Sequence, residues 1–177
     1  MKVLGFAASN SKTSINKKLV ETAFNFFENV ETEIIDLNDY EMPIFSMERE
    51  KENGHPQEAH DFLQKIEESD AIIISFAEYN RSISPAFKNI VDWASRIERQ
   101  VFQGKPVLLM STTPGGAFGS TVLQHAEVFI PHLGATVQGS YFLPFFNENF
   151  DDGKIINEEK NTELQEVIKN FQMTFQV

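Results

Sequence analysis

Short apolar runs alternate along this chain with segments of helical periodicity, and each run is too short to form a helix. Residues 3–8 form the first run, and residues 70–76 form the clearest one, which is β-branched through its centre. Continuous apolar runs of this length are typical of parallel strands covered on both faces. The sequence therefore predicts strands at residues 3–8, 32–37, 70–76, 105–111 and 136–141.

Apolar residues recur at helical spacing between these strands and after the last one. Pro56 suits the start of one helix, and Ser84 with Pro85 suits the start of another, while Pro131 helps to end a later one. Trp93 falls outside the apolar stripe of its helix. The residues expected to face inward are Leu19, Val20, Ala23, Phe24, Phe27, Ala59, Phe62, Leu63, Ile66, Phe87, Ile90, Val91, Ala94, Ile97, Leu164, Val167, Ile168, Phe171 and Phe175.

The alternation of strands and helices predicts an α/β fold with right-handed crossovers and helices on both faces of a parallel sheet. Five strands match the flavodoxin-like, doubly wound order 2-1-3-4-5, in which ligands bind at the carboxyl ends beside the switch between strands one and three. The 177 residues suit one domain, residues 1–177. The loops after strands one, three and four are therefore the candidate site.

Residues 38–55 interrupt the alternation with a long polar excursion. Loops of this length inside a compact domain are usually lids, interface arms or disordered segments. Residues 48–53 are expected to be solvated, because all of them are charged or polar.

Composition excludes several classes of function. A formal net charge of −11 argues against nonspecific binding to nucleic acid or to an anionic membrane. The chain has no cysteine, and its 4 histidines lack the spacing of a zinc site, so we expect no metal and no thiol nucleophile. The N-terminus lacks a long apolar segment before the first strand, and a cytoplasmic protein is the simplest interpretation. Any redox chemistry needs a bound cofactor.

The polar loop at residues 9–16 has the composition of a phosphate-binding loop. It places hydroxyl and amide side chains between a buried strand and a helix start, where free backbone N–H groups and the helix dipole favour an anion. The same residues are also common as a simple turn and helix cap. The other two loops must decide between these interpretations.

Motifs in all three loops resemble those of the NADPH-dependent FMN reductase family of flavodoxin-like flavoproteins, which includes quinone, azo-dye and chromate reductases. In the first loop Ser9, Ser14 and Asn16 match the family pattern, while Ala8 and Ser11 stand where the family has glycine and arginine. The second loop is the most specific: it has Glu78-Tyr79-Asn80-Arg81-Ser82, then Pro85, Phe87-Lys88-Asn89 and Asp92-Trp93, with Ala77 in place of a proline. Gly115-Gly116 match a Gly-Gly pair after the fourth strand.

The resemblance implies a bound FMN that takes a hydride at its N5 atom from NADPH or NADH and passes electrons to a small acceptor, such as a flavin, quinone or azo compound. The flavin carries that chemistry, so no catalytic side chain is required. The residues implied for cofactor binding are Ser9, Ser11, Lys12, Ser14, Ile15 and Asn16 at the phosphate and Glu78, Tyr79, Asn80, Ser82, Thr113, Pro114, Gly115 and Gly116 at the ring. Either Lys12 or additional hydroxyl donors would replace the family arginine.

Members of this family are commonly homodimers or homotetramers. Candidate contacts between subunits are Trp93, residues 42–45 and the aromatic segment 142–146. Packing within one chain is the alternative for these apolar residues.

Two rival functions stay open at this point. A Rossmann or P-loop nucleotide enzyme would use an acid such as Asp36 for a ribose, but the glycine patterns of both classes are missing. A flavodoxin-like electron carrier would bind FMN without turning over NAD(P)H, and acidic charge suits docking to a basic redox partner. Arg81 and Arg96 are both candidates to meet the 2′-phosphate of NADPH, and a surface role is equally plausible for each.

Overall fold

The structure is a computed structural model that describes residues 1–116 and 119–176. Its main sheet is parallel and follows the order β2-β1-β3-β4-β5. The strands are β1 (Lys2–Ala8), β2 (Glu31–Ile34), β3 (Ala71–Phe76), β4 (Pro106–Thr112) and β5 (Thr136–Leu143). The predicted flavodoxin-like architecture is therefore confirmed.

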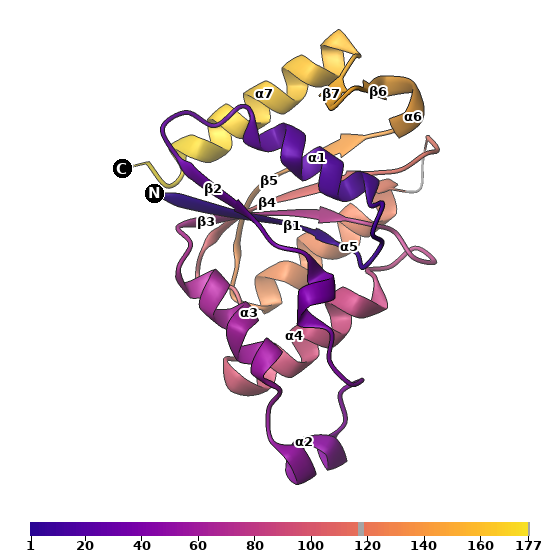
Figure 1. Cartoon of the computed structure of the whole chain (residues 1–177). Coiled ribbons are helices and arrows are strands. Elements are labelled where there is room, and N and C mark those ends of the chain that lie inside the picture. Colours follow the sequence, from indigo (N-terminus) through magenta and orange to yellow (C-terminus); the bar gives the residue numbers. More distant parts are fainter. Residues whose placement is uncertain (117–118, 177) are drawn as a thin grey trace.

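Helices cover both faces of this sheet (Figure 1). The helices are α1 (Ile15–Phe24), α2 (Met47–Asn53), α3 (Gln57–Glu67), α4 (Pro85–Ile97), α5 (Gly119–His132), α6 (Phe146–Asn149) and α7 (Glu158–Met173), with a 3₁₀ helix η1 (Leu37–Tyr40). A short antiparallel hairpin of β6 (Phe150–Asp151) and β7 (Lys154–Ile155) lies between α6 and α7. Helices α1 and α7 lie on one face, and α3, α4 and α5 lie on the other.

Two apolar clusters fill the space between the sheet and its helices. Alternate residues of β1 point to opposite faces, so that Val3 packs with α1 and α7 while Leu4 and Phe6 pack with α3 and α4. Burying both faces removes apolar area from water at roughly 25 cal/mol per Å², which is the main stabilising term. The predicted inward-facing residues of all these helices belong to one cluster or the other.

One glycine lets α1 lie close to the sheet. A Cβ atom at Gly5 would lie 2.5 Å from Cζ of Phe24 and 2.6 Å from Cγ1 of Val20, both on α1. The close approach of α1 to β1 positions the loop that joins them, and this loop is the first part of the candidate site.

The second strand ends earlier than predicted. It covers Glu31–Ile34 rather than residues 32–37, because the side chain of Asp36 accepts a hydrogen bond from the backbone N–H of Asn38 and caps η1. Asx caps of this kind turn the chain away from an extended path.

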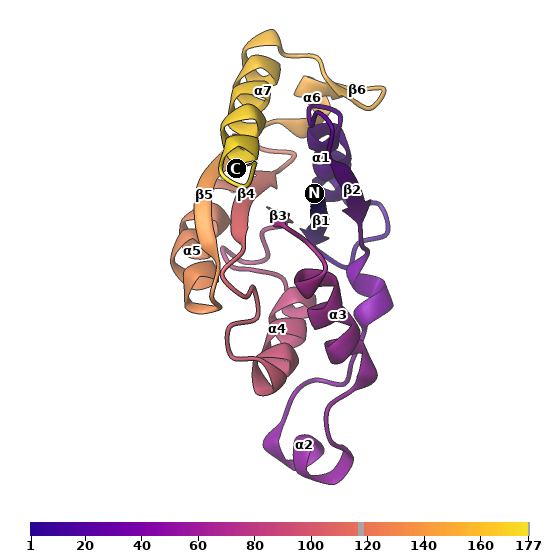
Figure 2. The same cartoon turned by 90° about the vertical axis from the view of Figure 1, so that its left-hand side faces the viewer.

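The polar excursion at residues 38–55, called the arm below, is an ordered projection. Helix α2, whose N-cap is Ser46, lies beyond α3 and α4 in both views (Figures 1 and 2). None of the residues of α2 is buried, which agrees with the predicted solvation of residues 48–53.

Trp93 is packed inside the chain, which corrects its prediction as a subunit contact. Its indole is only 2% exposed and donates a 2.7 Å hydrogen bond to the carbonyl of Pro43, and its ring meets the Phe45 ring edge-on at 5.0 Å. The arm therefore covers the side of α4 that carries Trp93, which lies outside the apolar stripe of that helix. Of the other predicted contacts, Met42, Leu143 and Phe146 are also buried, whereas Ile44 and Phe145 are exposed.

Candidate functional site

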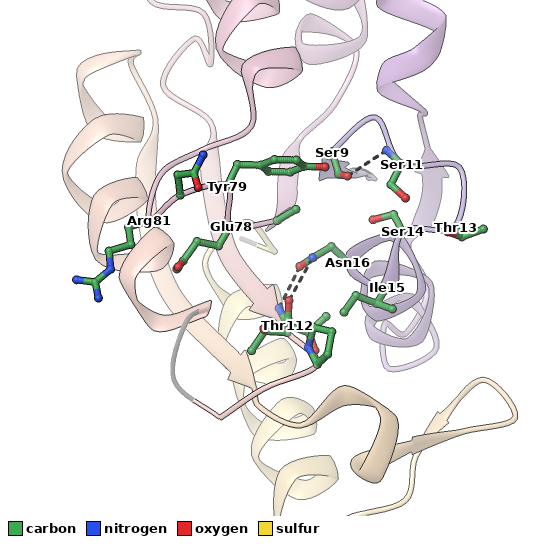
Figure 3. A pocket seen from close by; sticks show the side chains of 14 residues that line it. Ser9, Ser11, Thr13, Ser14, Ile15, Asn16, Glu78, Tyr79, Arg81 and Thr112 are labelled. Carbon is green, nitrogen blue, oxygen red and sulfur yellow. Dashed lines mark hydrogen bonds between the residues drawn. The ribbon is translucent and has the colours of Figure 1, made fainter.

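The loops after β1, β3 and β4 meet at the carboxyl edge of the sheet and enclose a cavity of about 640 Å³. Figure 3 shows side chains from all three loops around it. It lies beside the junction of β1 and β3, where the strand order reverses, as predicted. The lining residues are Ser9, Ser11, Thr13, Ser14, Ile15, Asn16, Ala77, Glu78, Tyr79, Asn80, Arg81, Thr112, Thr113 and Pro114.

Most of the predicted site residues line this three-loop cavity. The exceptions are Lys12, Ser82, Gly115 and Gly116. The lining residues that the sequence did not single out for cofactor binding are Thr13, Ala77, Arg81 and Thr112. The sequence contained a signal for two of these. Thr13 is a hydroxyl residue of the first loop, and Thr112 ends a strand at the same edge of the sheet.

The first loop presents hydrogen-bond donors to the cavity. The hydroxyl oxygens of Ser9 and Ser14 accept bonds from the backbone N–H groups of Ser11 (3.2 Å) and Lys17 (3.3 Å), which leaves each hydroxyl proton for another acceptor. Within the described residues no hydrogen bond engages the backbone N–H of Lys12 or Thr13. Free N–H groups, hydroxyl protons and the start of α1 together suit an anion.

Asn16 has a positioning role in this structure. Its Oδ1 accepts hydrogen bonds from Oγ of Ser75 (2.8 Å) and from the N–H of Thr112 (3.0 Å), and its Nδ2 donates to the carbonyl of Thr112 (3.3 Å). Its side chain is buried and connects α1 to the ends of β3 and β4. Asn16 therefore sets the distance between the first and third loops.

The second loop is a tight two-residue turn. Tyr79 and Ser82 exchange backbone hydrogen bonds of 2.9 and 3.0 Å, and Asn80 and Arg81 between them have φ values of 51° and 64°. Positive φ at both central positions is the geometry of a type I′ turn. The Ser82 hydroxyl lies 3.3 Å from Nδ1 of His125 on α5, outside the cavity lining.

Glu78 holds the second loop against α5. One carboxylate oxygen accepts a 3.1 Å hydrogen bond from the backbone N–H of Val122 in the first turns of that helix. A carboxylate is stabilised at this end by the helix dipole. Glu78 therefore caps a backbone N–H of a helix 44 positions further along the chain.

The third loop is shaped by aromatic packing. The N–H groups of Phe145 and Phe146 donate 2.9 Å hydrogen bonds to the carbonyls of Gly115 and Thr113. A Cβ atom at Gly116 would lie 2.5 Å from the Phe145 ring, so only glycine leaves room for that ring. Gly115 and Gly116 thus shape the loop from behind the cavity wall, and residues 117–118 of the loop lie outside the described residues.

Asp36 is committed to structural contacts. Its carboxylate accepts hydrogen bonds from Nζ of Lys17 (2.8 Å) and from both the backbone and side chain of Asn38 (3.0 and 2.7 Å). Partial burial acts to raise the pKa of Asp36, but these hydrogen bonds outweigh it and hold the pKa below its ordinary value of 3.8. Asp36 does not line the three-loop cavity, so it does not play the part of a Rossmann ribose acid there.

The residues of the second motif on α4 hold the arm. The Asn89 amide donates to the carbonyls of Met42 and Pro43 and accepts from the N–H of Phe45. Arg96 pairs with Glu50 at 3.0 Å, and its guanidinium lies 6.0 Å from the Phe45 ring centroid. Of the two arginines considered for a 2′-phosphate, Arg96 is thus engaged by the arm.

Within residues 1–116 and 119–176, no group of three or more His, Asp or Glu side chains could hold a metal ion. No helix of the described chain has the length and apolar character needed to cross a membrane.

The sheet order and its switch point define a flavodoxin-like α/β protein, with a cavity built from three loops at that point. The family model for NADPH-dependent FMN reductases matches residues 1–148, and the chain belongs to that family. An NAD(P)H:quinone oxidoreductase of Solanum tuberosum is 31% identical over 179 residues, which cover 95% of this chain and 89% of that protein.

Other relatives agree with this assignment. The quinone reductase of Escherichia coli (strain K12) is 30% identical over 97 residues, which cover 55% of this chain and about half (52%) of that protein. Among solved structures, the flavoenzyme NAD(P)H:(acceptor) oxidoreductase FerB of Paracoccus denitrificans superposes with a TM-score of 0.79 at 25% identity, covering 96% of this chain and 94% of that one.

Proposed function

We propose that this protein is an FMN-dependent oxidoreductase that transfers electrons from NADPH or NADH to a small acceptor, with residues 1–177 acting as one FMN-binding domain. The observation that supports it best is the three-loop cavity, which joins a donor-rich loop to a wall of aromatic and backbone groups at the switch point of a flavodoxin-like sheet. A volume of about 640 Å³ is within the usual range for a cofactor site.

The first loop fits a phosphate monoester. We assign phosphate binding to the hydroxyls of Ser9, Ser11, Thr13 and Ser14 and to the free N–H groups of Lys12 and Thr13, with Ile15 opening the helix and Asn16 positioning the loop. Since Lys12 does not line the cavity, hydroxyl donors are the better candidates to replace the family arginine. Charge-assisted hydrogen bonds to a phosphate are roughly twice as strong as neutral ones.

The second and third loops fit a flat conjugated ring. Tyr79 is 40% exposed, and with Asn80, Thr113 and Pro114 it lines the cavity beyond the first loop. Glu78, Ser82, Gly115 and Gly116 are assigned to hold these walls through the contacts described above. When bound, FMN supplies two-electron redox chemistry that the side chains lack.

The protein's own task is to bind and orient FMN and to leave one face of the flavin ring open. NAD(P)H and the acceptor would use that face in turn. With a quinone the overall reaction balances as NAD(P)H plus a quinone plus one proton giving NAD(P)⁺ plus the hydroquinone. We favour a quinone as acceptor because relatives that cover nearly all of this chain are named for it, with flavins and azo compounds as further candidates.

The test is an absorption spectrum of the purified protein with FMN, before and after anaerobic NADPH or NADH. Saturable binding followed by bleaching, together with steady oxidation of NADPH in the presence of 1,4-benzoquinone, supports the proposal. Binding without bleaching by either nucleotide would favour the rival electron carrier. An absence of saturable FMN binding would contradict the cofactor assignment.

We further propose a cytoplasmic homodimer or homotetramer. Ile44 and Phe145 are 76% and 43% exposed, and they belong to the two segments, 42–45 and 142–146, for which the sequence predicts contacts between subunits. Light scattering coupled to size-exclusion chromatography measures the mass directly, and a monomer of 20.2 kDa at micromolar concentration would contradict this proposal.

A further inference from the structure

Arg81 is the one cation among the described residues that line the three-loop cavity. Its side chain is exposed, and within residues 1–116 and 119–176 no hydrogen bond, ion pair or ring contact engages its guanidinium. Arg96, by contrast, is paired with Glu50 and lies against Phe45. Arg81 is therefore free to meet an anion that enters the cavity.

The sign of the charge near Arg81 depends on its neighbours. Among the described lining residues Glu78 is the one carboxylate. It accepts a hydrogen bond from the backbone N–H of Val122 on α5. Figure 3 shows Arg81 across the cavity from Ser11 and Thr13, with its guanidinium directed away from the first loop. The Arg81 guanidinium therefore lies apart from the donors of the first loop.

The backbone at Arg81 is unusual for an arginine. Its φ of 64° is in the left-handed region, where glycine and asparagine are favoured and a long side chain is not. The turn would be easier to form with glycine at this position. Strained residues that persist beside a ligand cavity are candidates for a functional role.

We propose that Arg81 binds the 2′-phosphate of NADPH and makes the protein select NADPH over NADH. This inference rests on the proposed function and adds its donor specificity. A 2′-phosphate carries a charge of about −1.5 to −2 at pH 7, and the protein's net charge of −11 repels it. The planar, exposed guanidinium of this lining residue offsets that repulsion and offers two parallel N–H groups to the phosphate oxygens. NADH lacks this phosphate, so it gains nothing from the contact.

The variants follow from the turn geometry. Arg81→Asn and Arg81→Gly remove the cation but suit positive φ, so both should fold at least as well as the parent. Arg99→Asn removes the same charge from an exposed position that is outside the cavity lining, and it serves as the matched control. Equal melting temperatures for these proteins would show that any kinetic change is local.

The kinetic test compares the two nucleotides with FMN-loaded protein. We expect the parent to have a lower KM for NADPH than for NADH, and both Arg81 variants to raise the KM for NADPH by about ten- to a hundredfold, the size of a lost hydrogen bond to a charged group. The KM for NADH should change less than about twofold, and Arg99→Asn should change neither. A parent that prefers NADH, or variants that shift both nucleotides equally or neither, would overturn the assignment.

A binding measurement separates this inference from the proposed function. Calorimetric titration of FMN-loaded protein with adenosine 2′,5′-bisphosphate should show affinity that falls by the same factor in Arg81→Asn, while 5′-AMP binds both proteins equally. Weaker reduction of a sulfonated quinone with unchanged binding of the bisphosphate would instead place an anionic acceptor at Arg81 and overturn the assignment. If neither nucleotide reduces the flavin in the parent, the proposed function fails, whereas equal bisphosphate binding in parent and variant overturns the role of Arg81.

Discussion

Asn16 and Thr112 are joined by two hydrogen bonds, because the Asn16 side chain accepts from the backbone N–H of Thr112 at 3.0 Å and donates to its carbonyl at 3.3 Å. The two residues are 96 positions apart, and the contact ties the first helix to the end of the fourth strand. A primary amide is one of the few side chains that offers a donor and an acceptor in this arrangement. Loop spacing at the cavity therefore depends on one buried side chain.

Replacing this residue should be costly. Asn16→Ala leaves the N–H and carbonyl of Thr112 and the hydroxyl of Ser75 without their partner in a buried place. We expect the free energy of unfolding to fall by about 3 kcal/mol, since each unsatisfied buried group costs roughly 1–3 kcal/mol. Urea denaturation followed by circular dichroism measures the change.

The control is Asn170→Ala, at an exposed position of α7. It should change the unfolding free energy by less than about 0.5 kcal/mol. Equal urea midpoints for the two variants would show that water replaces the Asn16 amide without loss of stability, and would contradict this prediction.

Two strand glycines make a second matched pair. Gly5→Ala would place a methyl group 2.5 Å from the Phe24 ring and should destabilise the protein by about 1–3 kcal/mol, as overpacking does. At Gly139 the nearest atom to an added Cβ is 3.7 Å away on Leu108, an ordinary contact. Gly139→Ala should therefore be neutral within about 0.5 kcal/mol or slightly stabilising. Thermal melts of both variants test the pair, and an unchanged melt for Gly5→Ala would contradict the close packing of α1 on β1.

A single amide, that of Asn89, makes three of the hydrogen bonds between the arm and α4. Asn89→Ala removes bonds to Met42, Pro43 and Phe45, while the fold beneath the arm keeps its own contacts. We expect tryptic cleavage after Arg49 or Lys51 to accelerate by about a hundredfold, because local opening governs cleavage and the three lost bonds contribute about 1 kcal/mol each. Time courses read by mass spectrometry identify the sites. Cleavage at the parental rate would mean that Trp93 and Arg96 hold the arm without Asn89.

Glu33 links β2 to its neighbours and makes stability depend on pH. Hydrogen bonds and ion pairs from Lys2 (2.7 Å) and Lys65 (2.6 Å) hold the pKa of Glu33 below its ordinary value of 4.5. A lowered pKa means that the stabilisation is complete above pH 4.5 and is lost as the pH falls below that value.

Glu33→Gln tests this sign. The parent should exceed the variant by about 0.5–1 kcal/mol in unfolding free energy at pH 7, a modest value because the three side chains are partly solvated. The difference should shrink in acid below pH 4.5 and in high salt. If the difference in unfolding free energy between parent and variant stayed constant below pH 4.5, the variant would be destabilised by the shape of the glutamine side chain and not by the lost charge.

Local pattern was enough for the sheet and for the place of the site. Apolar runs and helical stripes depend on residues near one another in the chain, so they predicted the strand order and the carboxyl edge at which three loops converge. The caps were equally local: Ser84 accepts from the N–H of Phe87, and Pro85 opens α4 as expected.

Contacts between distant segments were beyond that reach. Trp93 was a candidate subunit contact with packing inside the chain as the alternative, and only the arm, 50 residues away, shows that it is buried. Lys12 and Thr13 are adjacent in the first loop, yet Thr13 lines the cavity and Lys12 does not. That outcome follows from the direction of each side chain in a turn, which the tertiary packing sets.

The sequence by itself determined the alternating architecture and the family to which the motifs point. Only the tertiary structure decided that Asn16 bonds to the end of β4, that Arg96 is held by the arm and that Arg81 is left free at the cavity. The physical reason is that secondary structure responds to short-range periodicity, whereas the partner of a polar side chain depends on which segments the complete fold brings within about 3 Å of it.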